Sequence, residues 1–353
     1  MNYSAIGKHL FQVMEMNKML LNEQDTFIMG GETYLITGAN GFIGKSIAWA
    51  LIEHNRKEIG RPCKIILVVR NREKAVQKYG HLLNDNHIQL IINDNKERLH
   101  IQEKVDWIIC AAAITKKEKF HFQPADTLND NVFGIYNCLE LAREKKVKGI
   151  LFISSVQVYG RVQVQKISEE DFGKLDCMRE EAIYPESKRM GEMLVWAYSK
   201  QFGVKAKCVR LFHVYGEGEE YNNGTFLSDF LNDVISNRDI NIKGNGEEIR
   251  NLCYIKDVVR GIFCVLYRGN CGEAYNVGSE YNNYTIREYA EMIQRAAREM
   301  GREVGIAINN KEYINGKIID VQVPCIEKLK LLGWKEEYQD TILNFKKMLE
   351  QVV

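Results

Sequence analysis

A glycine-rich run directly after a short apolar segment is the feature that most constrains the fold of this chain. The apolar residues 34–36 precede the run TGANGFIG at positions 37–44. Its G-x-x-G-x-x-G spacing predicts a tight turn that joins a buried strand to a helix, where backbone N–H groups can approach a pyrophosphate. Taken alone, the run is also compatible with a turn that binds nothing. The residues expected to hold the pyrophosphate are Gly38, Asn40, Gly41, Phe42, Ile43 and Gly44.

A second pattern consists of a tyrosine and a lysine four residues apart, Tyr184 and Lys188. Residues at this spacing project from one face of a helix and can serve the same reacting group. Pro185 is tolerated only in a first helical turn, which places Tyr184 near the helix start. Ser155 follows the apolar run 150–153, and open parallel sheets carry their chemistry at the C-terminal ends of strands. The sequence therefore predicts a cleft that contains Ser155, Tyr184 and Lys188.

The order and spacing of these motifs resemble the extended short-chain dehydrogenase/reductases, in particular their nucleotide-sugar epimerase, dehydratase and decarboxylase group. The likeness runs from about Thr33 to the end of the chain. It implies an enzyme that binds NAD(P) and a nucleotide-diphosphate sugar. The further segments that carry it are Cys110 to Ala113, Asn131 to Asn137, Arg210 to Gly216, Arg250 to Val258 and Ala274 to Gly278.

Alternating apolar and helical patterns predict an α/β fold with a doubly wound, Rossmann-type parallel sheet. We expect a helical arm over 1–30, a dinucleotide-binding domain over 31–212 with a return near 252–268, and a smaller, mainly substrate-binding lobe over 213–353. In that lobe, Thr285 and Glu288 predict a capping box, and a last helix is expected near 341–351. The predicted strands are Tyr34–Thr37, Lys64–Val69, Ile88–Ile92, Trp107–Ala111, Gly149–Ile153 and Lys205–Leu211.

Charge and cysteine content argue against several other classes of protein. The chain has 48 Lys and Arg against 47 Asp and Glu, so we expect no nucleic-acid or membrane partner. Nine cysteines without metal-ligand spacing favour reduced thiols in the cytoplasm over disulfides or a metal site. Charges of both signs within residues 1–30 argue against a signal peptide and for an arm that packs on protein.

The resemblance also implies the remaining cofactor contacts. It places Asp94 against the adenine amine. NAD enzymes usually carry an acidic residue after the second strand, whereas Arg70 stands here, which favours NADP without excluding NAD. The residues expected beside the rest of the dinucleotide are Ala111, Ala112, Ala113, Asn131, Tyr184 and Lys188.

A base is needed because a sugar hydroxyl can lose hydride to nicotinamide only as its proton leaves. A tyrosine, whose ordinary pKa is about 10, is too weakly acidic unless nearby positive charge lowers that pKa. We expect Lys188 and the oxidised nicotinamide to supply this charge to Tyr184, and Ser155 to orient the hydroxyl.

The substrate contacts are expected from four further residues. Arg250 stands where similar enzymes hold the nucleotide diphosphate, and a guanidinium group suits paired phosphate oxygens. Asn223 lies in a segment that resembles their nucleotide-sugar loop, and His213 replaces the Asn common in the wider group. Thr225 stands where several decarboxylases have Arg. Gln157 completes the expected set.

Gln157 also decides among reactions, because dehydratases and decarboxylases that resemble this chain carry a carboxylate there. An amide cannot exchange a proton at ordinary pH. The C-terminal Arg of the decarboxylases is also absent from 318–324. Epimerisation at C4 needs neither group, so we expect a nucleotide-sugar epimerase. A 4,6-dehydratase or UDP-glucuronate decarboxylase, and a non-catalytic dinucleotide-binding sensor or assembly subunit, are the alternatives.

A homodimer is expected from the segments 131–143 and 184–202, which carry apolar residues on more than one helical face. In similar enzymes these two helices pair with their symmetry mates, as a self-complementary two-fold interface requires. Burial of the same residues between sheet and loops is the alternative.

Overall fold

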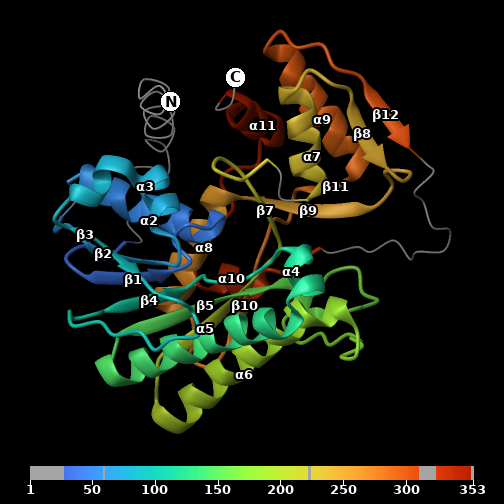
Figure 1. The fold of residues 1–353 in the computed structure, drawn as a ribbon. Coiled ribbons are helices and arrows are strands. Elements are labelled where there is room, and N and C mark those ends of the chain that lie inside the picture. Colours follow the sequence, from blue (N-terminus) through green and yellow to red (C-terminus); the bar gives the residue numbers. More distant parts are fainter. Residues whose placement is uncertain (1–27, 59, 222–223, 310–322, 351–353) are drawn as a thin grey trace.

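The fold is built on a seven-stranded parallel sheet with the order β10-β6-β5-β4-β1-β2-β3 (Figure 1). The computed structural model describes residues 28–58, 60–221, 224–309 and 323–350. The chain order reverses between β1 and β4, which is the switch point of a doubly wound sheet. The strands are β1 Thr33–Thr37, β2 Lys64–Val69, β3 Ile88–Ile92, β4 Trp107–Cys110, β5 Gly149–Ser155, β6 Ala206–Leu211 and β10 Ala274–Val277.

The predicted strands agree with the observed ones to within about two residues at each end, and β5 runs on through Ser155. The sheet contains one strand more than predicted, β10, which the chain reaches only after leaving the sheet at β6. The central strands are buried on both faces, which explains their unbroken apolar sequences. The predicted fold class is confirmed.

Helices cover both faces of the sheet (Figure 1). Because side chains alternate along a strand, Ile36 of β1 packs in one core and Leu35 in the other. The first core contains buried residues of α2 (Phe42–Arg56), α3 (Arg72–Tyr79) and α8 (Ile255–Arg268). The second contains those of α5 (Pro124–Lys145) and α6 (Ile183–Phe202).

A second group of elements follows β6 and lies beside the sheet's C-terminal edge (Figure 1). The capping box of Thr285 and Glu288 at the start of α9 is confirmed. Helix α8 and strand β10 return to the large sheet, whereas the boundary at residue 212 stays a prediction. The elements of this group are β7 His213–Tyr215, α7 Phe226–Ile235, β8 Ile240–Lys243, β9 Ile249–Tyr254, β11 Asn283–Thr285, α9 Ile286–Glu299, β12 Ile306–Asn309 and α11 Thr341–Glu350.

Short helices complete the chain: α4 Lys117–Phe122, α10 Glu327–Leu331 and the 3-10 turns η2 Gly80–Asn84, η3 Val156–Tyr159 and η4 Glu180–Ala182. All nine cysteines are free. Among the described helices, none combines the length and apolar character needed to cross a bilayer. Within the same residues, no cluster of His, Cys, Asp and Glu could hold a metal ion. Most of the predicted arm, residues 1–27, lies outside the described residues.

Gly191 lets α6 lie directly on β5, and this contact generates a stability prediction. A Cβ at Gly191 would lie 2.5 Å from Cζ of the buried Phe152. Alanine is favoured over glycine in a helix by about 0.8–1 kcal/mol, but overpacking a core costs about 1–3 kcal/mol. We therefore expect Gly191→Ala to lower the free energy of unfolding in urea titrations. The exposed Lys200→Ala on the same helix is the control, and a Gly191→Ala protein as stable as wild type would contradict this packing.

Candidate active site

The glycine-rich turn is packed backbone against backbone. Gly38 has a φ of +66°, and a Cβ there would lie 2.7 Å from the Cα and N atoms of Ala112. A Cβ at Gly44 would lie 2.4 Å from the carbonyl oxygen of Gly38. Both positions therefore require glycine, the first for its conformation and its close approach and the second for packing.

Helix α2 begins at this turn, and no side chain of the described residues caps its positive N-terminal end. Gly41 is the N-cap residue, and the first turn of the helix holds no acidic residue. The first N–H groups of an α-helix have no partner within the helix and attract anions. Asn40 donates to the carbonyl oxygen of Asn71 at 2.9 Å and thereby ties the turn to the end of β2. This arrangement fits the pyrophosphate of a dinucleotide.

At the adenosine end, the two predicted residues already have partners within the protein. Arg70 is half exposed and forms an ion pair with Asp130 at 3.2 Å. Asp94 is exposed and accepts a hydrogen bond from the backbone N–H of Lys96 at 3.0 Å. The ion pair offsets the charge of Arg70, so its position does not decide between NAD and NADP.

Asn131 connects the loop after β4 to the start of α6. Its Oδ1 accepts from the backbone N–H of Ile114 at 2.7 Å, and its Nδ2 donates to Ser187 Oγ at 3.2 Å. Ser187 in turn donates to the carbonyl oxygen of Tyr184 at 2.7 Å. Asn131 thus positions Tyr184 together with the loop that contains Ala111, Ala112 and Ala113. Sequence reasoning missed Ser187, although it lies within the motif that contains Tyr184 and Lys188.

The structure brings Ser155, Tyr184 and Lys188 together at the C-terminal end of β5. Ser155 is the last residue of β5, and its side chain lies near enough to Tyr184 to oppose the rise in the pKa of that tyrosine. Lys188 is buried and donates to the carbonyl oxygen of Ile153 at 2.7 Å. Its Nζ lies 5.6 Å from the centre of the Tyr184 ring. Phe120, which the sequence did not indicate, stacks on that ring with 6.1 Å between centroids.

Burial dominates the ionisation of both titratable groups. It raises the pKa of Tyr184 to about 12, and the interaction with the Ser155 side chain opposes this rise. Burial also lowers the pKa of Lys188 to about 8. In the protein without cofactor, burial therefore dominates, and the pKa of Tyr184 is raised rather than lowered as the sequence predicted. If Tyr184 is the base, most of the positive charge that stabilises its phenolate would have to come with the bound cofactor.

Gln157 lies in η3, directly after β5. Its backbone N–H donates to Ser155 Oγ at 3.2 Å, and its side chain is exposed. This residue therefore supports Ser155 through its backbone, and its side-chain amide is accessible to solvent or to a ligand.

Thr225, which stands where several decarboxylases have Arg, caps α7. Its side chain accepts a hydrogen bond from the backbone N–H of Ser228 at 3.2 Å.

His213 and Arg250 lie on adjacent strands of a three-stranded sheet. His213 of β7 pairs with Leu252 of β9, so the side chains of His213 and Arg250 lie on the same face. His213 Nδ1 is buried without a hydrogen-bond partner, and burial, together with the charge of Arg250, lowers the pKa of His213 to about 4. Arg250 donates to Glu248 at 2.6 Å. Asn223 lies outside the described residues.

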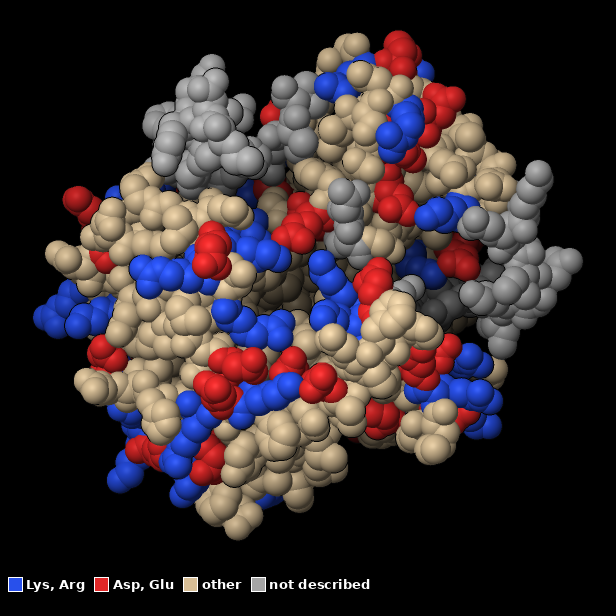
Figure 2. All heavy atoms as spheres, viewed as in Figure 1, with Lys and Arg blue, Asp and Glu red and all other residues tan. Residues whose placement is uncertain are grey.

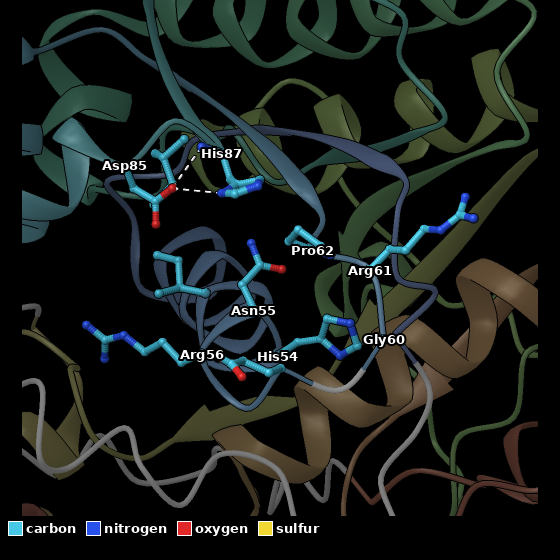
Figure 3. Close-up of a pocket in the computed structure, with 11 residues that line it drawn as sticks. His54, Asn55, Arg56, Gly60, Arg61, Pro62, Asp85 and His87 are labelled. Carbon is cyan, nitrogen blue, oxygen red and sulfur yellow. Dashed lines mark hydrogen bonds and ion pairs between the residues drawn. The ribbon is translucent and has the colours of Figure 1, made fainter.

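Figure 2 shows a hollow between the two parts of the molecule, with Lys and Arg side chains at its rim. A separate cavity of about 380 Å³ lies beside the N-terminal ends of β2 and β3. There Arg56 and Arg61 point away from each other, and Asp85 is bound to His87 (Figure 3). Asn55 is bound to Cys63. Polar groups do not converge on this second cavity, so it is a poor candidate for a ligand site.

Comparison with known proteins decides the family. Residues 34–278 match the family model for the NAD dependent epimerase/dehydratase family. The chain belongs to this family. It is 28% identical over 327 residues to UDP-glucuronic acid decarboxylase 1 of Xenopus tropicalis, an alignment that covers 90% of this chain and 72% of that protein.

Solved structures agree with the fold. A UDP-N-acetylglucosamine 4-epimerase from Methanobrevibacter ruminantium superposes with a TM-score of 0.78 at 18% identity, over 92% of this chain and 98% of that one. UDP-glucuronic acid 4-epimerase from Bacillus cereus, in complex with NAD, gives 0.73 at 20% identity, over 91% and 98%. The predicted family is confirmed, and the chain is an enzyme that uses NAD or NADP.

The position of Tyr184 generates the second prediction. Tyr184→Phe should retain cofactor binding, because the ring and its packing are kept, while turnover falls by roughly 10²- to 10⁴-fold. Turnover of the wild type should decrease as the pH falls below the pKa of Tyr184 in the loaded enzyme, since a base must be deprotonated, and the substitution should remove this dependence. Steady-state kinetics across pH and cofactor titration test both. Near-normal turnover of the variant would exclude Tyr184 as the base.

Proposed function

We propose that this enzyme is a nucleotide-sugar epimerase that inverts a hydroxyl carbon such as C4. Gln157 carries the proposal. It stands two residues after Ser155, where an elimination or a decarboxylation would need a group that exchanges protons. Inversion needs only that the hydroxyl proton and the hydride on its carbon be removed and then returned, the hydride to the opposite face of the keto sugar.

Each member of the catalytic set has a separate part in this reaction. Tyr184 Oη accepts the hydroxyl proton and later returns it, and Ser155 Oγ orients the hydroxyl and then donates to the developing carbonyl oxygen. Lys188, held by its bond to Ile153, keeps positive charge beside the tyrosine ring. The chemistry supplied by bound NAD(P) is the reversible oxidation of the carbon that carries this hydroxyl.

The sugar nucleotide is proposed to bind through its diphosphate. Arg250 and His213 share a sheet face, and guanidinium groups bind phosphate oxygens in pairs. In the free enzyme Arg250 donates to Glu248, so a diphosphate would replace that carboxylate or share the guanidinium group with it. The relatives named above act on UDP-sugars, which supports this substrate class. Asn223 remains a proposed contact on sequence grounds alone.

Of the alternatives, a decarboxylase or dehydratase has specific support. The sequence likeness to a UDP-glucuronic acid decarboxylase favours a decarboxylase or dehydratase. Glu181, an exposed residue of η4 three positions before Tyr184, is the acid that could replace the missing carboxylate. A non-catalytic sensor or assembly subunit is disfavoured, because Ser155, Tyr184 and Lys188 are all present and converge.

The product decides the reaction. When a panel of UDP-, dTDP-, GDP- and CDP-sugars is supplied, the wild type should invert a hydroxyl without a change of mass, as followed by mass spectrometry and NMR. Gln157→Glu should introduce some elimination, because it restores a proton-exchanging group, whereas Gln157→Met should not. A 4-keto-6-deoxy sugar or a pentose formed efficiently by the wild type would refute the epimerase proposal.

We also propose that the enzyme is a homodimer formed through α5 and α6. Several large apolar side chains on these helices are at least 40% exposed, which is more than packing within one chain requires. By contrast, Ile135 and Leu139 are buried against the sheet. The exposed side chains are Leu128, Phe133, Tyr136, Met190, Met193, Trp196 and Phe202.

We propose a cytoplasmic location for the enzyme. The nine free cysteines support this proposal, because reduced thiols are typical of cytoplasmic proteins.

Light scattering at micromolar concentration tests the dimer. The wild type should have the mass of two chains, and Trp196→Glu should shift the equilibrium towards the monomer because it places a charge in an apolar contact. Lys200→Ala, on the same helix, should leave the mass unchanged. A monomeric wild type at this concentration would contradict the proposal.

A further inference from the structure

The segment Gly216–Tyr221, which we call the strap, passes from β7 towards α7 and contacts two lysines, in α2 and α3, beside the glycine-rich turn. It is anchored on both sides. Glu217 accepts a hydrogen bond from Tyr254 and lies 3.9 Å from Nζ of the buried Lys256. Tyr221 donates to the carbonyl oxygen of Met348 in α11 at 2.9 Å. The strap is therefore held by β9, α8 and α11, while its middle contacts α2 and α3.

Lys45 joins α2 to the middle of the strap. It lies one turn into the helix, and helical side chains lean towards the N-terminus, so its ammonium lies near the end that attracts anions. Its Nζ donates to the carbonyl oxygen of Gly218 at 2.9 Å. Gly218 has a φ of +86°, and a Cβ there would lie 2.8 Å from Lys45 Nζ. The approach of strap and helix thus depends on glycine at this position.

Lys78 makes a second connection from α3. Its Nζ donates to the carbonyl oxygen of Asn40, within the glycine-rich turn, at 2.6 Å. The same Nζ lies 3.1 Å from Oε1 of Glu220 in the strap. One ammonium group therefore binds both the turn and the strap, so that the strap is fastened to the dinucleotide domain at two points.

Charges from three sides meet at these connections. Burial and the neighbouring charge of Lys78 lower the pKa of Lys45 to about 8, while Glu220 opposes this change. The hydrogen bond with Lys78 lowers the pKa of Glu220, and Lys116 and Lys74 add to the effect. Glu220 thus faces lysines of α3 and of the loop after β4, the two segments that flank the turn.

We propose that Lys45 and Lys78 retain the dinucleotide by fastening the strap across the glycine-rich turn, where its pyrophosphate binds. This inference rests on the proposed function, because an epimerase has to keep one dinucleotide through removal and return of the same hydride. Release of the cofactor then requires the strap to detach from both lysines. The two lysines also add positive charge near the phosphates, beside the α2 N-terminus.

Cofactor dissociation tests the proposal without a sugar substrate. The full-length enzyme is loaded with NADH or NADPH, chased with excess oxidised dinucleotide, and followed by loss of bound-cofactor fluorescence. Lys45→Met keeps much of the side-chain volume but removes the charge. It should speed dissociation roughly tenfold or more, which corresponds to the loss of one charge-assisted hydrogen bond. Glu220→Gln breaks an exposed pair and should speed dissociation roughly two- to fivefold.

Salt provides a separate readout of the Lys78–Glu220 connection. Dissociation from the wild type should become faster as salt screens this pair, and Glu220→Gln should reduce that dependence. Lys74→Met is the matched control, since Lys74 is an exposed lysine of α3 that contributes charge without holding the strap. Gly218→Ala perturbs the Lys45 connection from the strap side and should also speed release.

Circular dichroism and thermal melts show whether each variant is folded, and a variant that does not fold is replaced by the one that acts on the same connection from the other side. If the dissociation rates of Lys45→Met and Glu220→Gln both equal that of the wild type, the proposal that the strap retains the cofactor is wrong. Slower release from Glu220→Gln would also overturn it, because Glu220 would then compete with the cofactor. The ratio of variant to wild-type cofactor dissociation rates tests cofactor retention by the strap even if the product assay shows that the enzyme is not an epimerase.

Discussion

The close contact between the glycine-rich turn and the loop after β4 is the constraint on which the rest of the site depends. Gly38 lies against the backbone of Ala112, so the ends of β1 and β4 approach at the point where the sheet reverses its order. A side chain there would separate the two strands or displace the loop. Because Ile114 of that loop is bound to Asn131, and Asn131 to Ser187, the same contact also helps to fix the start of α6.

Burial of the catalytic groups has a chemical consequence. With a Tyr184 pKa of about 12 and a Lys188 pKa of about 8, the protein alone does not hold a phenolate. If Tyr184 is the base, the positive charge of a bound, oxidised nicotinamide would lower its pKa and so raise the fraction of phenolate when the acceptor for hydride is present. In that case the binding of the cofactor and the ionisation of Tyr184 would be linked through electrostatics.

Much of this architecture could be predicted because it depends on local patterns. Buried parallel strands have continuous apolar sequences, the turn needs its glycines, and Tyr184 and Lys188 share a helical face. The sequence did not predict β10 as a strand, because only four residues are involved and their pairing with β6 is non-local. The roles of Ser187, Phe120 and Lys45 were missed for a similar reason, since each depends on a stacking or hydrogen-bond partner that residue spacing alone does not reveal.

The fold does not determine which reaction this enzyme catalyses. Enzymes with different activities superpose on this chain with similar scores, so the outcome rests on a few side chains around a shared sheet. His213 shows how such a side chain can be tied to a ligand. A buried polar atom without a partner costs about 1–3 kcal/mol, and His213 Nδ1 is one in the free enzyme. A substrate group that hydrogen-bonds this nitrogen recovers that cost, and it does so beside Arg250, the group suited to a diphosphate. Under the proposed function, the substrate is selected where the folded chain leaves a polar group of His213 unsatisfied, and the reaction is selected where Gln157 cannot exchange a proton.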